Sequence, residues 1–300
     1  MPNAAEIRTR INSITETRKV TDAMYMISSV KMRKARRELE NTRPYFDALR
    51  LEIGELLHYI PENNDRYFRN LDPDGIRGRA LIVITSDKGL SGSYNQLCIK
   101  AAEKRIGEYS DSIPFVIGEY GRQFFTSKKI SMAQDFNYAA AFPTIQEARK
   151  ICAQLLELYD SDKVDEVDII YTHYKAGKSG EVRLQTLLPL DRTAFYDGND
   201  FELAAGKEYL PSPSAVLDGI VASYLTGFIY SALVDSYCSE QEARMSAMSS
   251  AGHNADEMLK NLRIQYNAVR QAAITREITE IAAGAKALKK KRRKLNRMGE

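Results

Sequence analysis

Small and apolar residues recur at steps of three and four positions near the C-terminal end of the chain. The members of this seam are Met248, Ala251, Ala255, Met258, Leu262, Val269 and Ala272, with Gln265 as its one polar position. This period is typical of a helix that packs along a second helix. The pattern therefore predicts a long C-terminal helix with a partner.

The N-terminal part of the chain supplies a candidate partner. Its apolar residues follow similar steps at Ile7, Ile11, Ile14, Val20, Met24, Ile27, Met32, Ala35 and Leu39. Neither Pro nor Gly occurs between Asn3 and Arg43, and we expect Pro44 to kink or restart a helix that continues to Tyr59. At ~1.5 Å per residue, the two terminal helices would be roughly 80 Å and 110 Å long, which exceeds a compact domain.

The pattern changes between the two helices, after a polar stretch with Pro and Gly at residues 61–78. Residues 79–85 (RALIVIT) are a short apolar run typical of a strand buried on both faces. A turn and a helix over 97–109 follow. The later elements that we predict are a strand at 114–118, a helix through Phe125, an ambiguous strand at 130–136, a helix at 144–158, and a hairpin of strands 167–175 and 182–189.

This alternation of strands and helices favours a mostly parallel sheet covered by helices. The predicted fold class is α/β, with a long antiparallel coiled coil of the N- and C-terminal helices and an inserted small Rossmann-like α/β domain. The predicted parts are an N-terminal helix (1–60), the inserted domain (61–208), a C-terminal helix (209–288) and a basic tail (289–300). Ser212 or Ser214 is the expected N-cap of the last helix.

Composition fits a protein with a core, since 44% of the 300 residues are hydrophobic. A formal net charge of +3 gives no general nucleic-acid footprint. The scattered Cys98, Cys152 and Cys238 argue against a disulfide framework and a zinc site, and favour a reducing compartment. We expect no membrane span and no leader peptide.

Two glycine-bearing segments are candidate phosphate sites. The GKS of residues 177–179 lacks the required upstream glycine, because Thr172 stands at that position, so a hairpin turn is favoured. The GLSG of residues 89–92 follows a strand and precedes a helix, so its backbone amides could bind an anion. A tight turn with Ser91 or Ser93 as the helix cap is the favoured interpretation.

The titratable residues form no catalytic constellation that we recognise. His58, His173 and His253 lie far apart, which argues against a metal site and a His-based triad. The acidic patch of Asp165, Glu166 and Asp168 is interpreted as a solvated loop. We therefore predict no catalytic residue, no cofactor and no metal.

Two basic segments stand out. The cations of residues 31–37 (KMRKARR) lie on several faces of a helix, where a solvated face and a partner-facing one are both open. Residues 289–294 are all Lys or Arg and lie beyond the seam. We expect this run to be frayed in isolation, and it could bind nucleic acid, anionic lipid or an acidic protein surface.

Three separated segments, in the same order as in a known family, carry a resemblance that spans nearly the whole chain. They are EIRTRINSITETRKVTDAMYMISSVKMRKA (residues 6–35), ITSDKGLSGSYN (84–95) and the region from ARM to GAKAL (243–288). The chain resembles the gamma subunit of F-type ATP synthases, the central rotor shaft. The common GLCGG turn of that family reads GLSGS here. No extra cysteine pair like that of chloroplast relatives is present, so thiol regulation is not expected.

The resemblance implies a non-catalytic rotor at the cytoplasmic face of the bacterial inner membrane, a peripheral subunit that transmits torque between proton or sodium flow and ATP synthesis. Its implied partners are the alpha and beta subunits of the catalytic hexamer, the epsilon subunit and the membrane c-ring. The tail from Lys289 is expected to project beyond the apex of the shaft.

The resemblance also implies partner contacts for individual residues. Met24 and Arg244 match positions that meet the mobile lower part of a beta subunit. Arg270, Gln271, Thr275 and Glu280 match polar contacts or helix-stabilising positions higher in the ring, and Tyr209 matches the foot beside the membrane ring. Met24 and Thr275 could equally be plain coiled-coil positions.

Two other functions are weaker alternatives. A nucleic-acid-binding module could use the GLSG turn and the basic tail as phosphate contacts, but it has no need of the long seam. An α/β enzyme could use the turn at residues 89–95, and would then show a ligand-dependent change in stability.

Overall fold

A computed structural model describes residues 3–60, 66–69, 76, 78–109, 111–175, 180–195 and 207–297, with the backbone alone at 287 and 289–297. These residues form two compact units, and we describe each by itself. Unit 1 comprises residues 1–25 and 248–300, and unit 2 comprises residues 26–247. Two long helices, α1 (Ala4–Leu57) and α5 (Pro213–Arg297), contribute to both units.

Local chemistry explains the ends of α1. The side chain of Asn3 accepts a hydrogen bond from the Ala5 N–H, and the Glu6 carboxylate accepts one from the Asn3 N–H, which together satisfy free amides of the first turn. At the other end, Arg192 donates to the carbonyl oxygens of Leu57 and Ile60. The helix continues through Pro44, so the proline does not restart it.

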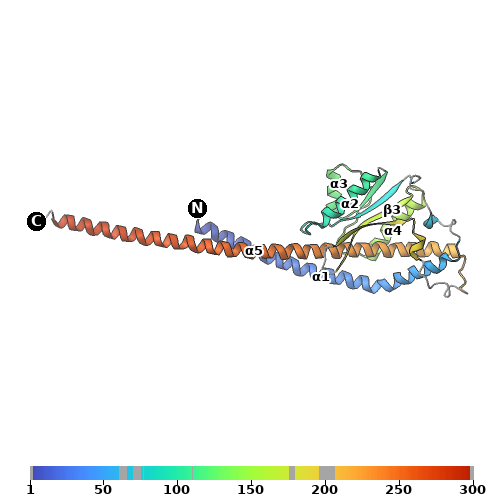
Figure 1. Cartoon of the computed structure of the whole chain (residues 1–300), viewed down its shortest axis with the longest axis horizontal. Helices are drawn as coiled ribbons and strands as arrows, with labels where there is room; N and C mark the ends of the chain where they lie inside the picture. The colour runs from blue at the N-terminus through green and yellow to red at the C-terminus, as the bar shows by residue number, and fades with distance from the viewer. Residues whose placement is uncertain are drawn as a thin grey trace. The chain divides into compact units, whose positions relative to one another are not determined.

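In unit 1, residues 4–25 of α1 pair antiparallel with α5 from residue 248. Arg18 Nε lies 2.9 Å from Asp256 Oδ1, and a Cβ on Gly252 would lie 3.8 Å from the Thr21 hydroxyl. The predicted terminal partnership is therefore confirmed. From Gln271 to Lys286 every side chain of α5 is exposed, and in Figure 1 this helix runs on past the start of α1.

The predicted seam of α5 is correct at every seventh residue and at the half-buried Ala251, but wrong at the later positions between them. Met248 and Ala255 are buried, and Leu262 and Val269 are half-buried. The intervening contacts come from Gly252, Leu259 and Tyr266, whereas Met258 is 54% exposed and Gln265 and Ala272 face solvent. Steps of three and four lead from the same residues to opposite flanks of a helix, and α1 packs on the flank that the four-residue step reaches.

The seam of α1 also differs from the prediction in its middle part. Ile7, Ala35 and the half-buried Leu39 are on it, but Val20 and Ile27 are 56% and 53% exposed. Thr21 and Ser28 take the buried positions instead. A search for apolar residues misses this part because small polar side chains let two helices approach closely there.

Unit 2 holds a four-stranded sheet in the order β2-β1-β3-β4. Its strands are β1 (Arg79–Ile84), β2 (Ser112–Ile117), β3 (Glu166–His173) and β4 (Glu181–Leu188). β1 runs parallel to β2 and β3, and β4 is antiparallel to β3. All six residues of β1 are buried, as expected of a central parallel strand. The predicted mostly parallel sheet with an added hairpin is confirmed.

The ambiguous strand at residues 130–136 is not a strand. Lys129 and Asp135 have φ values of 57° and 60°, so a left-handed residue directly precedes this segment and another lies within it. A hydrogen bond from the Ala133 N–H to the Pro114 carbonyl links it to the sheet. An apolar run is thus broken by backbone conformations that an extended strand does not allow.

Helices cover both faces of the sheet (Figure 1). α2 (Tyr94–Glu108) and α3 (Glu119–Ser127) pack on one face, while α4 (Ile145–Asp160) and α5 pack on the other. α4 begins with a capping box between Thr144 and Glu147. Short 3₁₀ helices η1 (Arg66–Phe68) and η3 (Arg192–Phe195) lie in the connections.

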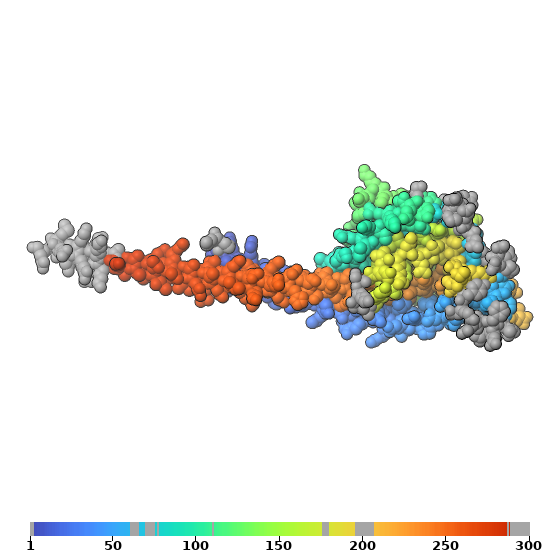
Figure 2. All heavy atoms as spheres, in the orientation of Figure 1, coloured from blue at the N-terminus to red at the C-terminus, as the bar shows by residue number. Residues whose placement is uncertain are grey.

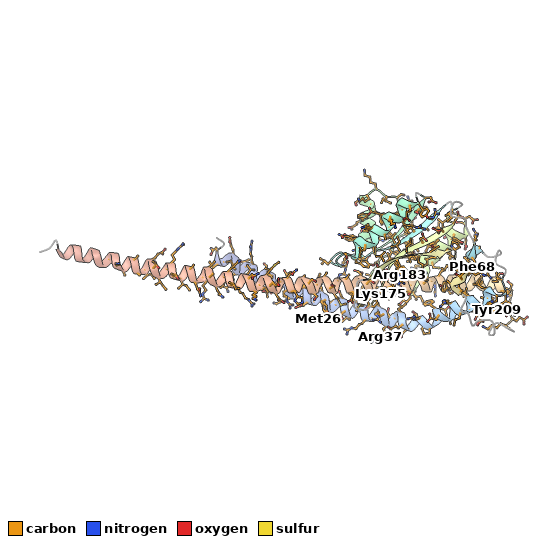
Figure 3. All side chains as sticks on the ribbon, viewed as in Figure 1. Met26, Arg37, Phe68, Lys175, Arg183 and Tyr209 are labelled. Atoms are coloured by element: carbon orange, nitrogen blue, oxygen red, sulfur yellow. The ribbon has the colours of Figure 1, made fainter. Side chains whose placement is uncertain are left out.

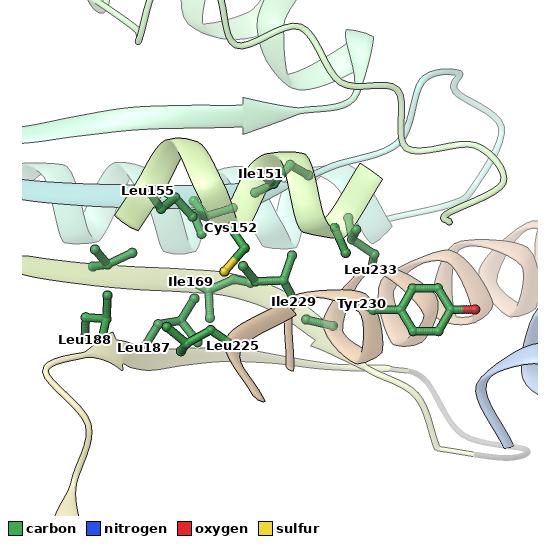
Figure 4. Close-up of a cluster of buried hydrophobic side chains, with 14 of the residues drawn as sticks. Ile151, Cys152, Leu155, Ile169, Leu187, Leu188, Leu225, Ile229, Tyr230 and Leu233 are labelled. Carbon is green, nitrogen blue, oxygen red and sulfur yellow. The ribbon is translucent and has the colours of Figure 1, made fainter. Parts of the chain in front are cut away.

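The larger core joins α5 to the sheet. Figure 4 shows Leu225, Ile229 and Leu233 of α5 facing side chains of α4 and β3, and all three are at most 4% exposed. Burying each such side chain stabilises the fold by roughly 1.5–3 kcal/mol. In the space-filling view of Figure 2, atoms of the α/β part lie directly against α5 in unit 2.

One stretch of α5 is long and apolar enough to cross a membrane by length and composition, with a mean hydropathy of 1.4. Half of that window is buried inside the protein, as in a core helix. The sequence expectation overlooked this stretch because polar residues interrupt its apolar run.

Candidate functional site

The turn after β1 is held by its own side chains. Asn95 Oδ1 accepts from the Ser86 N–H at 2.9 Å, and Ser86 Oγ lies 2.7 Å from the Lys88 carbonyl. Leu90 and Gly92 have φ values of 66° and 57°. The predicted tight strand-to-helix turn is confirmed.

The predicted capping of α2 by a serine side chain is wrong. Ser93 occupies the N-cap position without a side-chain hydrogen bond, and the buried Ser91 hydroxyl has no hydrogen-bond partner among the described residues. The Ser86–Asn95 interaction stabilises the turn instead, because it closes the loop from the strand to the first turn of the helix.

Arg244 links this turn to α5 by hydrogen bonds. Its Nη2 donates to the Gly89 carbonyl at 3.1 Å and lies 2.6 Å from Glu240 Oε1. The side chains of Arg244 and Glu240 are 11% and 8% exposed, so the ion pair is buried. Burial raises the pKa of Glu240, and the neighbouring Arg244 offsets part of that rise. Arg244 thus sits inside the chain, beneath an exposed turn.

Asp87 ties the same turn to the loop that precedes α4. Its carboxylate accepts hydrogen bonds from the backbone N–H groups of Ala140, Ala141 and Glu119 at 3.0, 2.9 and 3.2 Å. This loop presents Phe142, which is 59% exposed and has a φ of 56°. A network of hydrogen bonds to backbone amides therefore supports an exposed aromatic residue.

The basic segment of α1, residues 31–37, is partly packed and partly exposed. Lys31 Nζ lies 5.1 Å from the Phe142 ring centre, and the Arg36 guanidinium lies 5.3 Å from that of Tyr174. Met26 and Arg37 face solvent on α1 (Figure 3). Part of this segment therefore packs against the α/β part and part remains exposed.

The structure places the other residues predicted as partner contacts in separate places. Met24 is half-buried in unit 1, and Arg270, Gln271, Thr275 and Glu280 are exposed there on α5. Tyr209, labelled in Figure 3, lies in unit 2. Its ring makes an edge contact with that of Tyr59, with the ring centres 5.4 Å apart. Burial raises the pKa of Tyr209 to about 12, and the Glu52 carboxylate adds to the rise.

The acidic patch before β3 is not a solvated loop, contrary to our interpretation. Glu166 and Asp168 lie on β3, where Asp168 is 1% exposed. Arg105 Nη2 is 2.6 Å from Asp168 Oδ2 and 2.9 Å from Glu166 Oε1. Arg79 also pairs with Glu166, at 3.1 Å. The patch is one side of a buried ionic network that joins α2 to the sheet.

The other candidate residues, the histidines and cysteines, are not brought together into one site in the described part of the chain. Among the described residues, no group of three or more His, Cys, Asp or Glu side chains could hold a metal ion. His173 Nδ1 lies 2.7 Å from Asp235, while His58 and His253 are exposed. Burial raises the pKa of Cys98 and Cys152 to about 11. The GKS segment at 177–179 lies outside the described residues.

An antiparallel pair of long terminal helices that carries a mostly parallel sheet defines a shaft protein with a side domain. The family model described as ATP synthase matches residues 3–288. The ATP synthase gamma chain of Ruminiclostridium cellulolyticum is 39% identical, over 95% of this chain and 99% of the relative. The sodium-ion-specific gamma chain of Acetobacterium woodii is 32% identical, with 95% and 99% covered.

Solved structures show the same fold. The central stalk and c-ring structure of the Tetrahymena thermophila mitochondrial ATP synthase matches with a TM-score of 0.56 and 25% identity, over 77% of this chain and 99% of that one. A chain of the Euglena gracilis mitochondrial ATP synthase matches with a TM-score of 0.64 and 16% identity, over 95% and 94%. The chain belongs to the gamma-subunit family of F-type ATP synthases, the central-stalk rotor. Nothing in these comparisons supports the nucleic-acid-binding alternative.

Sequence reasoning missed the residues that organise the turn. Asp87 and Asn95 lie within the ITSDKGLSGSYN segment that carried the resemblance, so their position in it was the available signal. Glu240 precedes Arg244 by one helical turn, a spacing that predicts an ion pair. Its burial could not be read from the sequence, because it depends on the turn packing over it.

Proposed function

We propose that this chain is a non-catalytic shaft that transmits torque between an ion-driven membrane ring and an alpha/beta hexamer. It would act as a peripheral subunit at the cytoplasmic face of the bacterial inner membrane. The observation that carries the proposal is α5, which packs against the sheet in unit 2 and whose side chains are all exposed from Gln271 to Lys286 in unit 1. One helix thus supplies both a firmly held part and a part free to meet other subunits.

The exposed part of α5 is suited to a surrounding ring of subunits. Ile274, Ile278 and Ile281 are 44%, 62% and 70% exposed and follow steps of four and three. Such a stripe is the apolar side of a helix that needs a partner, which we assign to the alpha and beta subunits. Arg270, Gln271, Thr275 and Glu280 would make polar contacts beside it.

The turn of unit 2 is the second proposed contact with a beta subunit. Leu90 is 64% exposed at the tip of the turn, and Arg244 holds the turn from beneath. We therefore assign Arg244 the role of presenting the turn to the beta subunit. Met24 would contribute to the beta contact from α1.

The foot of unit 2 is the proposed contact with the epsilon subunit and the c-ring. Tyr209 is half-buried there, and its neighbour Leu210 is 77% exposed. The proposed division of labour assigns residues 1–60 and 209–288 to the shaft, 61–208 to the side domain and 289–300 to the tail.

The mechanism is differential contact. A shaft with different residues on each side presents a different surface to each beta subunit as it turns, so chemically identical sites differ in their affinity for ADP, phosphate and ATP. Each tenfold difference in affinity corresponds to about 1.4 kcal/mol of differential contact energy.

The test is co-expression with the alpha and beta subunits of the same organism. We expect the chain to copurify at one copy per hexamer and to raise ATPase turnover above that of the hexamer alone. Recovery of the chain as a free monomer, beside an alpha/beta assembly with unchanged turnover, would overturn the proposal.

A further inference from the structure

The end of β3 lies beyond the reach of β1. The ladder between these strands ends at the pair Val83 and Ile170. Beyond that pair β1 remains bonded to β2, since the Thr85 N–H donates to the Ile117 carbonyl at 2.9 Å. Thr172 is nevertheless 3% exposed, so its backbone groups need partners other than water.

Two serines of α5 supply those partners. The Thr172 N–H donates to Ser236 Oγ at 3.1 Å, and Ser239 Oγ donates to the Thr172 carbonyl at 3.2 Å. The serines are three residues apart, hence on one face of the helix, and are 1% and 2% exposed. They occupy the place of a neighbouring strand, and they bind the sheet backbone rather than their own helix.

The surroundings of this joint are polar and tight. Cys98 Sγ lies 3.2 Å from the Thr172 hydroxyl. Burial raises the pKa of Tyr94 well above its usual value, and Ser236 and Thr172 offset part of that rise. A Cβ added to Gly180 would come within 3 Å of the Ser239 hydroxyl, so the start of β4 also lies against α5. The joint therefore connects α5 to α2, β3 and β4 at one point.

The neighbouring part of the same interface is apolar. Leu225, Ile229 and Leu233 pack on α4 and the sheet through contacts that have no preferred direction (Figure 4). Such contacts resist separation better than they resist sliding. Hydrogen bonds are directional, so the two bonds at Thr172 fix one setting of the helix on the sheet.

We propose that Ser236 and Ser239 are positioning residues that lock the α/β part to α5 and thereby carry torque between them. This inference rests on the proposed rotor function. Removal of both hydroxyls leaves the apolar contacts in place but lets the helix slip against the sheet under load.

The experiment uses the complete ATP synthase in inverted membrane vesicles, with the Ser236→Ala, Ser239→Ala double variant. Ser231→Ala is the matched control, because Ser231 is a half-buried serine of α5 that makes no hydrogen bond to the described part of the sheet. ATP hydrolysis and ATP-driven ion uptake are measured on the same vesicles. We expect the double variant to keep hydrolysis within about twofold of wild type while ion uptake per ATP falls at least threefold.

A second measurement tests the joint without reference to rotation. Amide hydrogen exchange at Thr172 in the full-length chain should be at least tenfold faster in Ser236→Ala than in wild type, and unchanged in Ser231→Ala. Unchanged exchange, or unchanged ion uptake per ATP, overturns the proposal. If the double variant fails to assemble, each single variant should still lower ion uptake per ATP, and singles that couple like wild type would also overturn it. Loss of coupling with the wild-type chain would count against the rotor function instead.

Discussion

At the scale of single residues, the turn after β1 contains an unsatisfied group. The Ser91 hydroxyl is buried without a hydrogen-bond partner among the described residues. It stands where the family turn GLCGG, by the resemblance described above, has cysteine. A buried hydroxyl that makes no hydrogen bond lowers stability by roughly 1–3 kcal/mol.

Replacing that hydroxyl should therefore stabilise the chain. We expect Ser91→Cys to raise the free energy of unfolding by about 1 kcal/mol, measured by urea denaturation. The control is Ser93→Ala, which removes an exposed hydroxyl that makes no cap bond and should change stability by less than about 0.5 kcal/mol. A loss of stability in Ser91→Cys would show that the hydroxyl has a partner.

The buried ion pair of the turn gives a prediction with a pH dependence. Arg244→Gln should destabilise unit 2 by about 3–5 kcal/mol at neutral pH, because Glu240 is left charged and buried. Burial already raises the folded-state pKa of Glu240, and loss of the cation raises it further.

The direction of the pH dependence follows from the raised pKa of Glu240. A carboxyl whose folded pKa exceeds its unfolded pKa costs stability as pH rises through the interval between the two values. The deficit of Arg244→Gln relative to wild type should therefore shrink as pH falls through this interval, when Glu240 takes up a proton. Denaturation curves with an equal deficit at pH 5 and pH 7.5 would contradict this assignment.

At the scale of elements, the glycines of α5 differ in what surrounds them. A Cβ at Gly227 would collide with the Phe46 ring, whereas a Cβ at Gly219 would meet nothing within 4 Å. Gly227 therefore allows α1 to approach α5 closely.

Two alanine substitutions should separate packing from helix propensity. Gly219→Ala should stabilise the chain by about 0.5–1 kcal/mol through propensity alone. Gly227→Ala gains the same propensity but overpacks the interface, so we expect a net loss of about 1–3 kcal/mol. Thermal denaturation of both variants checks the difference, and equal stabilisation would mean that Phe46 moves aside freely.

The helices and strands show how far the sequence predicts the fold. Helix and strand positions follow from periodicity, so β1 and α4 appear within a residue or two of their predicted ends. The flank of the seam could not be predicted, because Met258 and Leu259 are equally apolar and the packing of α1 decides which is buried. Asp168 looked solvated because its partner Arg105 is 63 residues away in the sequence.

The family resemblance predicted which residues are candidate contacts. The structure shows what surrounds each of them. Arg270 and Glu280 are exposed, as a contact needs. Arg244 forms an ion pair with Glu240 and donates a hydrogen bond to the Gly89 carbonyl. The contact with Gly89 could not be predicted from spacing, because the turn lies more than 150 residues away in the sequence.

At the scale of the whole molecule, the pairing of the two ends of the chain can be tested by cross-linking. In unit 1, Gly252 lies against Thr21, so cysteines at these two positions should form a disulfide on oxidation. ATP hydrolysis by the assembled enzyme should stay within about twofold, because both helices belong to the same rotating body.

A control pair tests whether that cross-link is specific. Val20→Cys with Gly252→Cys should give little product, since Val20 is 56% exposed on another side of α1. Equal yields from the two pairs would contradict the antiparallel seam, and loss of hydrolysis in the Thr21 pair alone would contradict a single rotating body.

The basic tail gives another prediction at this scale. The family model ends at residue 288, just before the run of six Lys and Arg residues. Deleting residues 289–300 should leave assembly and ATP hydrolysis nearly intact, because the exposed apolar stripe at Ile274, Ile278 and Ile281 remains. Size-exclusion chromatography and ATPase assays of the complex check this, and complete loss of assembly would refute it.

The isoleucine stripe of α5 has a consequence for how much of this chain a cell can keep. An orphan copy, made in excess over the other subunits, displays Ile274, Ile278 and Ile281 to water. Bare stripes of this kind drive self-association and attract quality-control proteases. The abundance of the chain should therefore follow that of the subunits that cover it. The exposed isoleucines of α5 thus require that this chain and its partner subunits be made in matching amounts.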